Sequence, residues 1–209
     1  MPECDCHLEA KTKDDRRTLA IALGLNAAMF IVDLVGGILG GSSGLIADSL
    51  DMLADASVYG IGLVAIDRTL VFKANAARVS GLVLLALGVG AVLDVVRRGV
   101  FGSEPMGSVM FGIALLALAV NATVLRLLSK HRAGEVHLRA TWISTRADVV
   151  ANAGVIAAGI LVMLTGSRLP DLVVGFGIGT YVVKEAMEIL REAREALEHE
   201  ATTSRAVGP

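Results

Sequence analysis

Three aspartates in one apolar stretch have the spacing needed for joint chemistry. Asp48, Asp51 and Asp55 follow one another at intervals of three and four residues within the stretch 44–66. In an α-helix this spacing places all three carboxylates on one face, about one turn apart. An ionisable group inside a membrane span costs roughly 2.5–3.5 kcal/mol on insertion scales. Because like charges at that distance also oppose one another, we expect a divalent cation, or protons in its absence, to compensate them.

A second polar face is predicted for the apolar stretch 138–164. Ser144, Asp148 and Asn152 recur there every four residues, so they share one side of a helix. If the two faces meet in the membrane, carboxylate and hydroxyl oxygens supply about the four ligands of a tetrahedral zinc site. We therefore predict a metal site from two helices, with the ligands Asp51, Asp55, Asp148 and Ser144. Further candidates for this site are Asp48, Asn152 and Asn26.

The elements that position these residues are six apolar stretches. Of the 209 residues, 54% are hydrophobic and 19% charged, and the mean hydropathy of +0.66 exceeds what a soluble domain needs. A membrane-spanning helix needs about 20 mostly apolar residues. The stretches that qualify are 18–39, 44–66, 79–96, 106–128, 138–164 and 169–190. Because backbone groups in lipid must be bonded internally, we predict an all-α membrane protein, a six-transmembrane-helix bundle over residues 18–190.

Charged residues indicate the orientation of this bundle and its partners. Fifteen Lys and Arg residues lie on the side of the N-terminus, against three on the other side, Arg97, Arg98 and Arg168. The excess of positive charge predicts that both termini are cytoplasmic. Tails are expected at 1–17 and 191–209, and the second begins as a charged helix with Arg and Glu at i,i+4 spacing. The formal net charge of −2 argues against nucleic acid as a partner.

Further polar residues within the spans also need partners. Asn26 and Asp33 are seven residues apart and face one way, which suits either a role beside the ion pathway or hydrogen bonding between helices. Asp94 is expected to pair with Arg97 or Arg98 near the membrane surface. For Arg146 we expect a buried ion pair with an acidic neighbour such as Asp48.

The N-terminal tail contains a compact set of soft metal ligands. Cys4, Cys6 and His7 lie within four residues, together with Asp5. Such a patch can capture zinc or cadmium on the cytoplasmic side. It is equally compatible with a disordered tail, because short Cys/His tracts are only compositional indications.

Two segments carry a resemblance to a known family. The segment 42–55, SSGLIADSLDMLAD, resembles the second-helix signature of the cation diffusion facilitator family, in which a His or Asp is followed four residues later by Asp. The segment 138–152, LRATWISTRADVVAN, resembles the other half of the family's metal site. Carried over by position, Asp51 and Asp55 match the second-helix ligands and Asp148 matches the Asp of the fifth helix.

The resemblance implies a secondary transporter that exports divalent transition-metal ions from the cytoplasm in exchange for protons. Zinc is the first candidate, with cadmium, cobalt, iron and manganese as alternatives, and no cofactor is expected. Members that prefer zinc usually carry His at the position of Ser144. The serine oxygen in its place favours harder ions. The sequence stops short of the cytoplasmic C-terminal domain with which many members dimerise. We therefore expect a short form of the family, a homodimer whose assembly and regulation stay open, in the bacterial inner membrane.

Acids within membrane spans also occur in two other classes of protein. An intramembrane aspartyl protease needs about two acids sharing a proton, whereas here three acids lie on one helix. Its Gly-x-Gly-Asp motif is also missing, since Ile178 follows Gly175-Phe176-Gly177. A passive cation channel or a purely structural bundle is the second alternative. We expect no enzyme activity.

Overall fold

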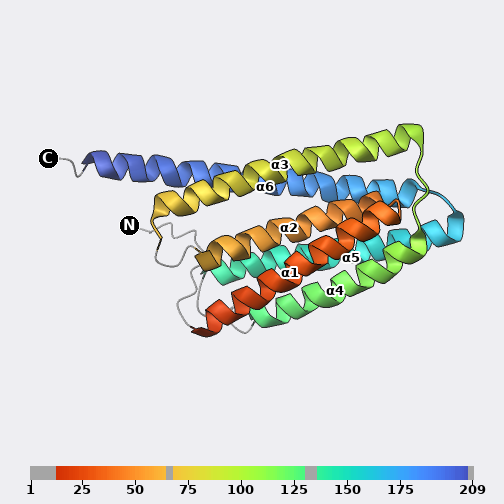
Figure 1. Cartoon of the computed structure of the whole chain (residues 1–209), viewed down its shortest axis with the longest axis horizontal. Coiled ribbons are helices and arrows are strands. Elements are labelled where there is room, and N and C mark those ends of the chain that lie inside the picture. The colour runs from red at the N-terminus through yellow and green to blue at the C-terminus, as the bar shows by residue number, and fades with distance from the viewer. Residues whose placement is uncertain (1–12, 65–67, 130–135, 207–209) are drawn as a thin grey trace.

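Six helices form an elongated bundle (Figure 1). The computed structural model describes residues 13–64, 68–129 and 136–206, and the side chains of 16–64, 68–128 and 148–200. The helices are α1 (Lys13–Leu39), α2 (Ser43–Val64), α3 (Leu70–Phe101), α4 (Gly107–Ser129), α5 (Val136–Thr165) and α6 (Leu169–Ala206). The predicted six-helix architecture is confirmed. The start of α1 and the end of α6 lie at the same end of the bundle, as an even number of spans requires (Figure 1).

Four of these helices are long and apolar enough to cross a membrane. They are α1, α3, α4 and α5, judged by length and composition over the described residues. With 22 and 38 residues, α2 and α6 are also long enough for a span. Their apolar sequence is interrupted by charged residues, including the three aspartates of α2. Hydropathy alone therefore describes α2 and α6 least well.

The helices extend beyond the apolar stretches that identified the third and sixth spans. We expected a connecting segment up to residue 78 and again from 97, yet α3 runs from Leu70 to Phe101. Thr69 caps its start, because the Thr69 hydroxyl accepts a hydrogen bond from the backbone N–H of Phe72 at 3.3 Å. α6 continues past residue 190 to Ala206, in agreement with the charged helix expected at the start of the second tail. Hydropathy detects only the part of a helix that suits lipid, whereas the helix itself continues into the aqueous phase.

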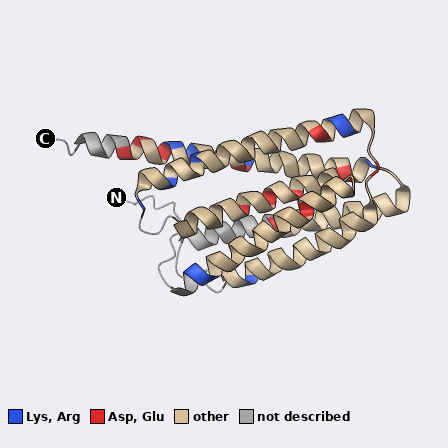
Figure 2. Cartoon of the chain, in the orientation of Figure 1, with Lys and Arg blue, Asp and Glu red and all other residues tan. Residues whose placement is uncertain are grey.

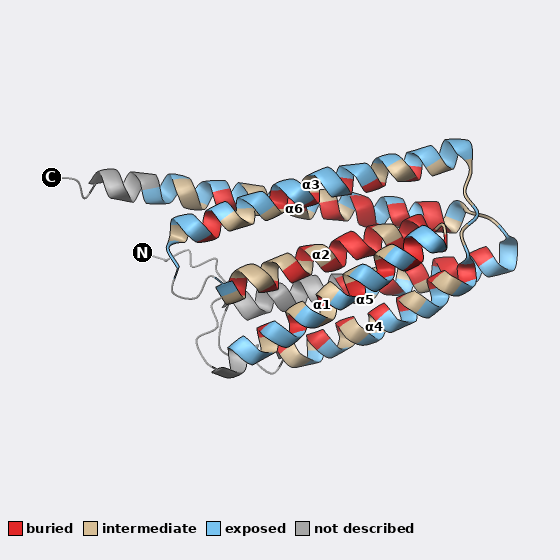
Figure 3. Ribbon diagram, in the orientation of Figure 1, coloured by how far each residue is buried: buried red, intermediate tan, exposed pale blue. Residues whose placement is uncertain are grey.

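α2 lies at the centre of the bundle (Figure 3). α1 packs mainly against α2, α4 against α5, and α3 against α6, while α2 also contacts α3 and α6. Each of the apolar core clusters of the described side chains contains a residue of α2, from Leu45 at one end to Tyr59 at the other. Within α2 only Val64 is exposed. The central position of α2 removes its acidic face from lipid.

Glycines allow the helices to turn and approach closely. Gly41, between α1 and α2, has a φ of 62°, a left-handed conformation that side chains disfavour. Gly107 at the start of α4 lies so close to α5 that a Cβ there would be 2.5 Å from the carbonyl oxygen of Gly159. Small residues at such crossings are typical of membrane helices, because van der Waals packing replaces the hydrophobic effect.

Candidate metal centre

The three aspartates of α2 occupy one interior face, as their spacing predicted. Asp48 is fully buried and Asp51 is 4% exposed, whereas Asp55 is half-buried. The hydroxyl of Tyr59 donates a hydrogen bond to Oδ2 of Asp55 at 3.4 Å. Midway along the inner helices, Asp and Glu residues gather, while Lys and Arg lie towards the helix ends (Figure 2). The low-dielectric centre of the bundle therefore contains several acidic groups.

Asp148 of α5 faces the same place as the acids of α2. Its side chain is 3% exposed and is close enough to Asp51 and Asp55 to interact electrostatically with both. The two helices named by the sequence thus bring three carboxylates together. Such a group of oxygens can bind a divalent cation once the protons between them are released.

The described residues nevertheless do not form a complete ligand set. Among them, no three His, Cys, Asp or Glu side chains have the arrangement of a metal cluster. Asn152 is fully buried beside the site, where its Nδ2 donates a hydrogen bond to the carbonyl oxygen of Asp148 at 2.9 Å. The side chain of Ser144 lies outside the described residues, as do Cys4, Cys6 and His7. Their metal-binding roles stay predictions.

Two polar residues inside the bundle were missed by the sequence prediction. Glu185 of α6 interacts electrostatically with Asp148, so a third helix contributes an acid here. Asn121 of α4 is 1% exposed, and neither of its side-chain polar atoms has a hydrogen-bond partner among the described residues. A polar amide inside an apolar span is itself a signal, which could have identified Asn121. The position of Glu185 depends on the packing of α6 and has no comparable signature.

Asp171 at the start of α6 holds the N-terminus of α2, a contact that no local sequence pattern indicates. Its fully buried carboxylate accepts hydrogen bonds from the Ser42 hydroxyl at 2.6 Å, the Ser43 N–H at 2.8 Å and the Gly44 N–H at 2.9 Å. A negative charge stabilises the positive end of a helix dipole. Asp171 thereby fixes the helix that carries the acidic face to α6.

The end of the bundle beyond Asp171 carries the predicted surface ion pair. Asp94 accepts hydrogen bonds from Arg97 at 2.7 and 3.0 Å and also pairs with Arg98, which confirms that expectation. Arg98 additionally donates to the carbonyl oxygen of Gly41. The side chain of Arg146 lies outside the described residues, so its predicted pairing with Asp48 stays a prediction.

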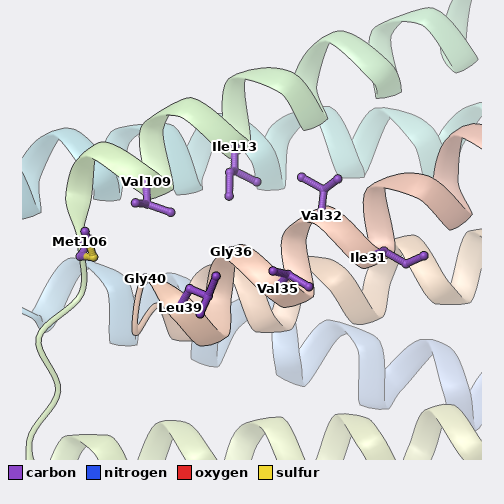
Figure 4. A pocket seen from close by; sticks show the side chains of 9 residues that line it. All are labelled: Ile31, Val32, Val35, Gly36, Leu39, Gly40, Met106, Val109 and Ile113. Carbon is purple, nitrogen blue, oxygen red and sulfur yellow. The ribbon is translucent and has the colours of Figure 1, made fainter.

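An apolar groove of about 570 Å³ lies apart from these acids (Figure 4). It runs between α1 and α4 near the α1–α2 turn. Its lining consists of Ile31, Val32, Val35, Gly36, Leu39, Gly40, Met106, Val109 and Ile113. With no ionisable side chain among these residues, the groove is suited to apolar contacts and not to metal binding.

A sequence profile of the cation efflux transmembrane domain matches residues 19–197 of the chain, which include all six helices in whole or in large part. The chain belongs to the cation efflux family. This confirms the resemblance to the cation diffusion facilitators and identifies a multi-pass membrane protein. Because the family and its named relatives are transporters, the chain is not an enzyme, and the protease alternative is dropped.

Named members of the cation efflux family match most of this chain. The metal cation efflux system protein CzcD of Cupriavidus metallidurans is 27% identical over 88% of the chain and 62% of its own length. The zinc transporter ZitB of Escherichia coli is 25% identical over 92% of the chain and 66% of its own length. A cadmium, cobalt and zinc/H(+)-K(+) antiporter of Bacillus velezensis is 23% identical over 85% and 64%, respectively. The chain thus spans less than two thirds of the length of the relatives it matches.

Proposed function

We propose that this chain exports divalent transition-metal ions from the cytoplasm, zinc first, in exchange for protons. The observation that carries the proposal is the approach of Asp148 to Asp51 and Asp55 inside the bundle. Uncompensated carboxylates are expensive in a low-dielectric interior. A divalent ion that enters between them replaces protons, so uptake of metal and release of protons are linked.

The proposed mechanism is alternating access around this one site. Metal enters from the cytoplasmic end, binds the deprotonated carboxylates, and is displaced by protons on the far side. The names of the relatives support the substrate class, since they mention zinc, cadmium and cobalt, and one mentions H(+). Ser144 is the proposed fourth ligand. The same proposal includes a homodimer in the bacterial inner membrane and metal capture by Cys4, Cys6 and His7.

The variants Asp51→Asn and Asp148→Asn test the site, with Asp94→Asn as the matched control. Each change removes one carboxylate charge and keeps the side-chain shape. We expect at least about a 100-fold loss of Zn²⁺ affinity at the two site positions, since even residues that only support a ligand contribute 10- to 100-fold. Asp94 pairs with arginines at the end of the bundle, so its variant should bind and transport normally.

Transport is measured in vesicles that contain the purified full chain, with and without an imposed pH gradient. Antiport predicts faster Zn²⁺ uptake when protons move in the opposite direction. Equal rates under both conditions would exclude proton exchange. Near-normal transport by either site variant would remove that aspartate from the proposed site.

A further inference from the structure

A second pair of buried carboxylates lies beside the proposed metal centre and is not used by it. Asp33 of α1 and Asp48 of α2 are both fully buried. They are close enough to repel each other electrostatically. Among the described side chains, none of their four carboxylate oxygens has a hydrogen-bond partner. Two unpartnered acids at one place in a membrane protein are too expensive to be retained as helix contacts alone.

Helix packing places these two acids at one level in the bundle. α1 and α2 run antiparallel and touch at Gly37, where a Cβ would lie 2.8 Å from the backbone nitrogen of Ile46. Asp33 lies four residues from that crossing along α1, about 6 Å, and Asp48 lies two residues from it along α2, about 3 Å, so the two positions differ by only about 3 Å along the bundle. This level is about one turn nearer to the α1–α2 connection than Asp51.

α5 contributes a third oxygen at the same level. Val155 contacts Gly44 of α2, with 3.8 Å between the Val155 Cγ1 and a Cβ at Gly44. One turn along each antiparallel helix from this contact, Asn152 comes level with Asp48. The Oδ1 atom of Asn152 is buried and has no hydrogen-bond partner in the described part of the chain. Three helices therefore bring unsatisfied oxygens to one level.

No hydrogen bond joins Asp33 and Asp48. Two carboxyl groups that share a proton are joined by a hydrogen bond. Among the described side chains, the oxygens of Asp33 and Asp48 have no hydrogen-bond partner, so a shared proton does not hold this pair together. Two carboxylates balance the charge of one divalent ion, and an amide oxygen is a further ligand for it.

We propose that Asp33 and Asp48, with the Asn152 amide oxygen, form a second divalent-cation site on the exit side of the metal centre. The inference rests on the proposed function, because it assumes that ions leave the Asp51 site towards the α1–α2 end. A nearby second site gives the departing ion oxygen ligands before it reaches water. Conduction through narrow pathways generally uses such neighbouring sites of moderate affinity.

Equilibrium dialysis of the purified full chain against Cd²⁺ tests this second site. All chains carry Cys4→Ser and Cys6→Ser, so that the N-terminal thiols do not add to the bound Cd²⁺. In this background the variants are Asp33→Asn and Asp48→Asn, with Asp51→Asn and Asp94→Asn measured in parallel. We expect the parent chain and the Asp94 variant to bind a second equivalent of Cd²⁺ that both the Asp33 and Asp48 variants lose. Retention of the first equivalent in these two variants shows that they are folded.

The results separate the second site from the proposed function. If the Asp33 and Asp48 variants keep both equivalents while the Asp51 variant loses one, the second site is refuted and the transport site stands. If the Asp51 variant also binds both equivalents and transports normally, the proposed function itself fails. Should an Asn variant not fold, Asp33→Glu retains the charge in a longer side chain. Loss of the second equivalent of Cd²⁺ in that folded variant supports the second site. If the Asp33→Glu variant keeps the second equivalent with unchanged affinity, the proposed site is contradicted, because a longer side chain would misplace the carboxylate.

Discussion

Replacing Asp171 by Asn tests whether the cap on α2 holds the acid-bearing helix in place. The wild-type carboxylate accepts three hydrogen bonds of 2.6–2.9 Å from residues 42–44. Asn has nearly the same shape, yet one of its two terminal groups is an NH2 donor. That NH2 group would face the backbone N–H of Ser43 or of Gly44, so one N–H of the α2 terminus loses its partner.

The expected loss of stability follows from two contributions. A hydrogen bond to a charged group contributes about 1.5–3 kcal/mol, and a negative charge at a partly buried helix N-terminus contributes about 1 kcal/mol. Together they predict a destabilisation of about 3 kcal/mol. For a chain of this length, each kcal/mol shifts the unfolding midpoint by about 2–4 °C, so Tm should fall by about 6–12 °C.

Thermal unfolding of the purified protein in detergent measures this shift. The control is Glu195→Gln, which changes the same chemical group on the same helix. Glu195 lies 3.7 Å from Arg191, with 67% of its side chain exposed, and such exposed pairs contribute at most about 1 kcal/mol. If Tm of the Asp171 variant stays within the range of the control, the carboxylate does not stabilise the α2 terminus and the capping argument is wrong.

Three other predictions concern the metal centre and the packing around α2. Ser144→His should raise the affinity for Zn²⁺ relative to Mn²⁺ by at least about tenfold, because an imidazole nitrogen suits zinc better than a hydroxyl does. If the ratio of the two affinities in a competition titration is unchanged, position 144 does not belong to the ligand set. Zn²⁺ affinity of the wild-type chain should fall as pH is lowered, since the carboxylates bind metal only when deprotonated. Asp51→Asn should flatten this dependence in equilibrium titrations. A pH-independent affinity of the wild-type chain would argue against carboxylate ligands. Gly175→Ala should destabilise the fold by about 1–3 kcal/mol, because a Cβ there would lie 2.8 Å from the Ser43 backbone. Gly177→Ala is the control, since a Cβ at Gly177 meets nothing within 4 Å. Equal melting temperatures of the two variants would show that the α2–α6 contact adapts freely.

The sequence predicted the number and order of the helices because their apolar lengths match the bilayer. The ends of the apolar stretches are not the ends of the helices, since membrane contact and helix formation end at different residues. The charged start of α3 and the end of α6 remain helical outside the apolar stretches. On α6 this continuation is supported by pairs such as Arg194 and Glu198, which lie 2.7 Å apart.

The acidic face of α2 was predictable for a different reason. The spacing of Asp48, Asp51 and Asp55 within one helix fixes their common direction before any packing is known. The partners of that face depend on tertiary contacts. Asp148 was found through its own polar stripe, but the cap by Asp171 joins segments more than 120 residues apart and leaves no local pattern.

The position of α2 explains why its polarity is compatible with a membrane. A helix whose sides face lipid must be apolar, as α1, α3, α4 and α5 largely are. α2 is surrounded by other helices, so its acids face the protein interior and not lipid. There, oxygens, protons or a bound cation can compensate the carboxylate charges. A hydropathy criterion therefore omits the very helix around which transport is proposed to occur. The presence of several acids on a helix flanked by apolar spans is better interpreted as a sign of a buried ion site than as a reason to place that helix outside the membrane.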